Sequence, residues 1–146
     1  MRYWLMLLVL AASPVCAQVS VEQPWSRATP PGAKIGVGFM QLRNSGFAAE
    51  RIVGASSPLA GKVEMHVTTR EGDVMKMREV TSFEIPAGGT FELKPGGAHL
   101  MLMSLRKPLQ KGDRVPLTLK LESGGVLEVE LPVAAMGARG PGHSRH

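Results

Sequence analysis

Residues 62–80 read KVEMHVTTREGDVMKMREV and decide the fold class. Two short runs rich in Val, Thr and Met, at 62–70 and 74–80, flank the turn-forming Glu71-Gly72-Asp73. Short runs of this kind, joined by a turn that contains glycine, are typical of an antiparallel β-hairpin. The stretch therefore predicts two paired strands.

The rest of the chain repeats this pattern. Short apolar or alternating runs are separated by Gly, Pro, Asn and Ser, and no stretch has the period of a useful amphipathic helix. Further strands are expected at residues 19–25, 35–43, 49–55, 91–93, 98–105, 115–122 and 126–131. About eight to ten short strands at regular spacing predict an all-β protein, either an antiparallel β-sandwich or a barrel.

The first 17 residues, MRYWLMLLVLAASPVCA, predict a cleaved signal peptide at 1–17. Arg2 precedes an apolar run of about ten residues, which is too short to span a bilayer, and Val15-Cys16-Ala17 fits a small-residue cleavage site. The alternatives are an N-terminal membrane anchor and a lipoprotein signal, although the residues before Cys16 suit lipidation poorly. Cleavage predicts an exported protein, which in a Gram-negative cell lies in the periplasm.

The composition of the 146-residue chain excludes several classes of function. Its one cysteine, Cys16, leaves with the signal peptide, which excludes thiol redox chemistry, disulfides and Cys-based zinc sites. The 17 basic and 12 acidic residues are dispersed, without the aromatic-rich basic patch that nucleic-acid binding favours. No later segment is apolar enough for stable membrane insertion. We expect one folded domain at 18–133 and a flexible tail at 134–146.

Histidine and methionine remain as candidate metal ligands. His66 lies in the first hairpin strand, Met77 lies in the second, and His99 and Met101 lie in a later strand. Residues i and i+2 of a strand share a face, so His99 and Met101 are expected on one face. If Glu71-Gly72 is a two-residue loop, His66 lies directly opposite Met77.

Two imidazoles and two thioethers make a ligand set without carboxylate or thiolate. Neutral soft sulfur favours Cu(I) over zinc, calcium and magnesium, and imidazole also suits copper. The uncompensated charge of the metal favours a shallow site near the surface, from which the ion is passed on. The alternative interpretation is that the methionines fill the core and the histidines are surface or hydrogen-bonded residues.

The spacing of His66, Met77, His99 and Met101 resembles the signature H-x10-M-x21-H-x-M of the periplasmic copper chaperones called PCuAC. All four positions match without a gap, and the similarity covers most of residues 20–132. It is carried further by Trp25-Ser26-Arg27-Ala28-Thr29, Asn44-Ser45-Gly46, Glu64-Met65-His66, Pro86-Ala87-Gly88-Gly89 and residues 93–103. The resemblance implies a cupredoxin-like antiparallel β-sandwich of Greek-key topology, with Cu(I) bound by the four side chains.

The resemblance also implies delivery of copper towards the binuclear copper centre of cytochrome c oxidase. We expect the carrier to be monomeric and, without a thiol or an evident Ser-His-Asp arrangement, not to be an enzyme. The partner would be the copper-bearing subunit of the oxidase or a thiol-bearing assembly factor. The alternative function is a periplasmic copper buffer that serves resistance. Met136, His143 and His146 in the tail form a candidate secondary metal site for Cu(II), for which the alternative is a solvated end without a metal.

Overall fold

The computed structural model describes residues 18–141, and in this range the chain forms ten strands and no helix that could cross a membrane. The strands are β1 (Val19–Arg27), β2 (Gly36–Asn44), β3 (Glu50–Ser56), β4 (Ala60–Glu71), β5 (Val74–Val80), β6 (Phe83–Ile85), β7 (Thr90–Leu93), β8 (Ala98–Leu105), β9 (Arg114–Leu121) and β10 (Val126–Ala134). All the expected strands are confirmed, with small shifts at their ends. The sequence pattern does not predict β6, because three residues are too few to show a period. The expected signal peptide at 1–17 lies outside the described residues.

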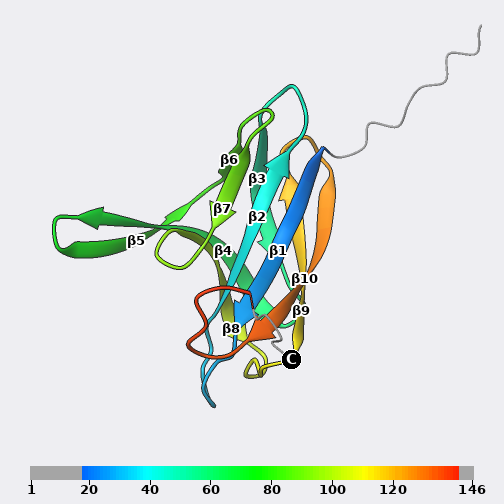
Figure 1. Cartoon of the computed structure of the whole chain (residues 1–146). Coiled ribbons are helices and arrows are strands. Elements are labelled where there is room, and N and C mark those ends of the chain that lie inside the picture. Colours follow the sequence, from blue (N-terminus) through cyan, green and yellow to red (C-terminus); the bar gives the residue numbers. More distant parts are fainter. Residues whose placement is uncertain (1–17, 142–146) are drawn as a thin grey trace, which may run out of the picture.

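The strands form two layers that face each other (Figure 1). One layer has the order β5-β4-β8-β7-β2-β1, and the other has the order β10-β9-β3-β6. A short parallel pairing between β1 and β10 connects the layers, and β7 also runs parallel to β8. The other neighbouring strands run antiparallel. The expected all-β, cupredoxin-like architecture is confirmed.

The core lies between the two layers and is built from alternate residues of the strands. Leu100 and Leu102 of β8 are almost fully buried in one cluster with Leu117 and Leu119 of β9. Because successive side chains of a strand point to opposite faces, Met101 lies on the outer face of its layer. The outer face of β4 and β8 is therefore available for a site, while the inner face stabilises the fold.

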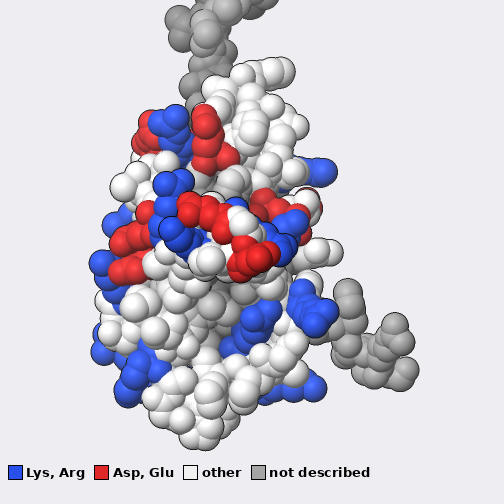
Figure 2. All heavy atoms as spheres, turned by 90° about the vertical axis from the view of Figure 1, so that its left-hand side faces the viewer, with Lys and Arg blue, Asp and Glu red and all other residues white. Residues whose placement is uncertain are grey.

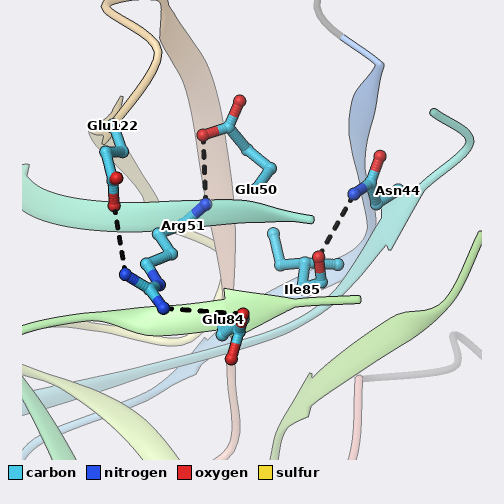
Figure 3. Close-up of polar contacts among 6 residues, drawn as sticks. All are labelled: Asn44, Glu50, Arg51, Glu84, Ile85 and Glu122. Atoms are coloured by element: carbon cyan, nitrogen blue, oxygen red, sulfur yellow. Dashed lines mark hydrogen bonds and ion pairs between the residues drawn. The ribbon is translucent and has the colours of Figure 1, made fainter. Parts of the chain in front are cut away.

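Polar contacts fix one end of the sandwich around the loop between β2 and β3 (Figure 3). The buried side chain of Asn44 donates from Nδ2 to the carbonyl of Ile85 at 3.1 Å, which ties the end of β2 to β6. Arg51 of β3 forms exposed ion pairs with Glu84 at 3.6 Å and Glu122 at 3.7 Å. A cleft of about 720 Å³ lies at this end, and none of the four predicted metal ligands lines it.

The segment after β10 lies against the layer that contains β1 and β2. Trp25 and Phe39 are buried there, with ring centroids 4.6 Å apart. The Arg27 guanidinium lies over both rings, and its Nε donates to the carbonyl of Ala138 at 2.7 Å. The first residues of the expected tail therefore contact the domain, with Ala134 as the last residue of β10 and Ala138 in the segment beyond it.

Candidate metal centre

Three neighbouring strands bring the four predicted ligands to one sheet face. His66 of β4 lies directly opposite His99 of β8, and their ring centroids are 5.7 Å apart. Met101 lies two residues beyond His99, opposite Glu64 of β4. Met77 lies on β5, on the other side of β4, and is diagonal to His66. Directly opposite residues share a face, and the residues opposite Met101 and Met77 each lie two positions from His66 on β4. All four side chains therefore share the outer face.

The register of the hairpin differs from the predicted one. The two-residue loop is Gly72-Asp73, not Glu71-Gly72, so Met77 lies opposite Thr68 and not opposite His66. Gly72 has a φ of 62°, which suits the first loop position of a tight hairpin turn that requires positive φ there. The predicted register is therefore wrong by two residues. Since two is the period of a strand, Met77 still shares the face of His66.

The four side chains range from buried to exposed. His99 is 5% exposed, and the side chain of His66 is 14% exposed. Met101 is partly exposed, whereas Met77 is 52% exposed on a hairpin that projects beyond the two layers (Figure 1). The candidate site is therefore anchored in the sheet by its imidazoles and is open to solvent at the Met77 thioether.

The His99 ring is held by one hydrogen bond. Its Nδ1 lies 3.1 Å from the carbonyl oxygen of Gly97, and because a carbonyl only accepts, the ring proton belongs on Nδ1. The other nitrogen, Nε2, is shielded from solvent and has no hydrogen-bond partner within residues 18–141. Burial lowers the pKa of His99, although the hydrogen bond to Gly97 acts in the opposite direction. The ring is therefore neutral at neutral pH and keeps a lone pair on Nε2.

A carboxylate that the sequence analysis did not single out lies beside His66, outside the predicted set of four ligands. Glu64 Oε2 is 2.8 Å from His66 Nε2, and Oε1 is 3.1 Å from Nζ of Lys62. These two hydrogen bonds, the one with His66 first, hold the pKa of Glu64 below its ordinary value. Nδ1 of His66 is shielded from solvent and lacks a partner in the described part of the chain. The period of two along Lys62, Glu64 and His66 is the signal that could have placed Glu64 on this face.

The unpartnered ring nitrogens point to a ligand. Buried polar atoms nearly always have a hydrogen-bond partner, so two exceptions on facing imidazoles require an explanation. The thioethers of Met77 and Met101 share their face, and this neutral, soft donor set fits Cu(I) better than ions that prefer oxygen ligands. Among residues 18–141, no group of three or more His, Cys, Asp or Glu side chains is arranged to hold a metal. A site here therefore needs its thioethers.

The candidate secondary site in the tail is not assembled in the described structure. Met136 follows the end of β10 and is 55% exposed. His143 and His146 lie outside the described residues. Metal binding by these three residues stays a prediction.

The chain has relatives among lipoproteins. The family model described as "Putative lipoprotein LpqE-like" matches residues 19–133. A relative from Leifsonia xyli subsp. xyli, "Putative lipoprotein Lxx21020", is 36% identical over 116 residues, which are 79% of this chain and 69% of the relative.

Solved structures share the fold. The solution structure of Cu(I)-DR1885 from Deinococcus radiodurans is 35% identical to the chain, with a TM-score of 0.67 over 84% of this chain and 83% of DR1885. The apo PCuAC domain of PmoF2 has a TM-score of 0.71 over 84% of this chain and 94% of that domain. Its identity is 24%, so this match supports the fold alone. The chain belongs to the LpqE-like family and is of the PCuAC type.

Proposed function

We propose that this protein is a periplasmic copper chaperone that binds Cu(I) through His66, Met77, His99 and Met101. One observation carries the proposal: within the described residues, His66 Nδ1 and His99 Nε2 are buried without partners on the sheet face that holds both thioethers. A copper ion supplies the partner that both nitrogens lack, and the thioethers favour its reduced state. The relative DR1885, which is solved with Cu(I), supports this assignment.

The exposure of Met77 suits a carrier that hands its ion on. Its strand, β5, is at the edge of the layer, and six of the seven residues of β5 are exposed. Ligands of a partner can therefore approach copper from the hairpin side and replace the Met77 thioether without unfolding the sheet. Figure 2 views the molecule from the side on which the hairpin projects and shows Lys and Arg, but neither Asp nor Glu, on the surface below the hairpin. That charge suits an acidic partner surface.

The acceptor that we propose is the copper-bearing subunit of cytochrome c oxidase, on the way to its binuclear copper centre, or a thiol-bearing assembly factor. The protein acts as a monomeric carrier without enzymatic activity. Export through a signal peptide at 1–17 places the 18–133 domain and the 134–146 tail in the periplasm, and the lipoprotein relatives support export. The alternative is a lipoprotein signal, in which Cys16 would carry lipid and anchor the exported protein.

A periplasmic copper buffer that serves resistance is the second candidate function. The half-exposed Met136, together with His143 and His146, would then add a Cu(II) site to the main one. Transfer of copper to an acceptor protein distinguishes the two functions. Copper-loaded protein mixed with the copper-free, copper-binding domain of the oxidase should lose its metal to that domain if the protein is a chaperone. Retention of the copper would favour the buffer.

Titration with Cu(I) against a competing chelator tests the site itself. The double variant Met77→Leu plus Met101→Leu should bind Cu(I) much more weakly, because leucine keeps the apolar bulk but removes both sulfurs. Met75→Leu is the matched control, since Met75 lies on the same strand and is 55% exposed, much like Met77. An affinity of the double variant equal to that of the wild type would overturn the assignment.

A further inference from the structure

We propose that Glu64 is a positioning residue that orients His66 towards the metal, an inference that rests on the proposed copper site. Glu64 Oε2 lies 2.8 Å from His66 Nε2, and the two side chains are only 16% and 14% exposed. An ionised carboxylate accepts hydrogen bonds and cannot donate them. The bond therefore fixes the ring proton of His66 on Nε2 and leaves the lone pair on Nδ1, the buried nitrogen that has no partner in the described structure.

The two imidazoles of the site thus present different nitrogens. His99 is held through Nδ1 by the Gly97 carbonyl at 3.1 Å and offers Nε2, whereas His66 is held through Nε2 and offers Nδ1. Histidines that bind metals commonly donate their other N–H to a carboxylate or carbonyl, which fixes the tautomer and the ring orientation. Glu64 on β4 and the Gly97 carbonyl just before β8 therefore each fix the tautomer and orientation of one ring.

The Glu64 carboxylate is itself held in place from two sides. Its Oε1 lies 3.1 Å from Nζ of Lys62, which leaves Oε2 for His66. Glu64 also lies directly opposite Met101 on β8, so the carboxylate is next to two of the proposed ligands. All four proposed ligands are neutral, and a negative charge at this position offsets part of the charge of a bound copper ion.

The hairpin offers a matched control in Glu79. This residue lies directly opposite His66 on β5 and shares its face, yet in the described structure the His66 ring donates its hydrogen bond to Glu64 and not to Glu79. Glu79→Gln therefore removes a neighbouring charge and leaves the hydrogen bond intact. Glu64→Ala removes both, and Glu64→Gln removes the charge but keeps an oxygen that accepts from Nε2.

The test is ¹⁵N NMR of the imidazoles in the copper-free protein at alkaline pH, where histidines are neutral. In the wild type, His66 should show a protonated Nε2 with a proton protected from exchange, and His99 should show a protonated Nδ1. Glu64→Ala should lose the protected His66 proton, while the His99 signals and the backbone spectrum report that the fold is kept. Glu64→Gln and Glu79→Gln should both retain the His66 signal.

Cu(I) titration of the same variants against a chelator completes the test. Glu64→Ala should weaken binding by about 10–100-fold, Glu64→Gln should weaken it less, and Glu79→Gln should match the wild type. A wild-type His66 protonated on Nδ1, or a Glu64→Ala variant with wild-type signals and affinity, overturns the role of Glu64. If the wild type shows the expected tautomer but binds no Cu(I), the proposed function is overturned, while the hydrogen-bond assignment stands.

Discussion

Replacing His99 with leucine should stabilise the copper-free protein, although the residue is buried on a central strand. The ring is 5% exposed, and its Nε2 has no hydrogen-bond partner within residues 18–141. A buried unsatisfied nitrogen costs about 1–3 kcal/mol, and the lost hydrogen bond from Nδ1 to the Gly97 carbonyl is worth about 0.5–1.5 kcal/mol. The free energy of unfolding should therefore rise by about 1 kcal/mol in the variant.

Urea unfolding of the copper-free protein, followed through the fluorescence of the buried Trp25, measures this change. Leu100→Ala serves as the control, because Leu100 is the next residue of β8 but lies on the core face. That variant should lose about 2–5 kcal/mol. A loss of more than about 1 kcal/mol in His99→Leu would refute the reasoning, since it would mean that the imidazole is fully satisfied without a metal.

With bound Cu(I), the wild type should become more stable than His99→Leu. Free Cu(I) at a hundred times its dissociation constant stabilises a folded protein by about 2.7 kcal/mol. The wild type should gain this amount, and His99→Leu should gain much less because it lacks the Nε2 ligand. An equal gain in both proteins would show that copper binds elsewhere.

Three further perturbations follow from the structure. Acidification below pH 6.5 should reduce the unfolding free energy of the copper-free wild type more than that of His99→Leu. Burial lowers the pKa of His99, so the unfolded chain takes up the proton first. Urea unfolding at a series of pH values measures this, and an equal pH dependence of the unfolding free energy in both proteins would contradict it. Asn44→Ala should lower the free energy of unfolding by about 2–3 kcal/mol, because Asn44 is buried and its side chain forms hydrogen bonds with Ala48, Ile85 and Gly46. A loss below about 0.5 kcal/mol in urea unfolding would show that these hydrogen bonds contribute little. Gly72→Ala should lower the free energy of unfolding by about 1 kcal/mol, because Gly72 has a φ of 62°. It should also weaken Cu(I) binding by loosening the hairpin that carries Met77. Unchanged stability in urea unfolding would mean that the turn adopts another conformation without cost.

The strands and the shared face of the ligands could be predicted from the sequence because both depend on a period of two. His99 and Met101 are two residues apart, and this spacing alone puts them on one face of β8. Similarly, any even shift of the hairpin leaves Met77 on the face of His66. The face was therefore predictable even though the pairing partner of Met77 was not.

Other features depend on contacts that the sequence pattern does not specify. The loop position depends on which residue takes positive φ, and Gly72 fits either place in a two-residue loop. The contact between Glu64 and His66 depends on the conformations of both side chains and on Lys62, which binds the other oxygen of the same carboxylate. Strand β6 forms because Phe83 and Ile85 enter the core beside β3. This is a tertiary effect that a three-residue sequence pattern cannot predict.

X-ray absorption at the copper edge of the Cu(I)-loaded protein tests the central claim most directly. We predict a copper ion bound by two nitrogens and two sulfurs, from His66, His99, Met77 and Met101, with one sulfur fewer in Met101→Leu. A shell without sulfur, or one that Met101→Leu leaves unchanged, would contradict the proposed site.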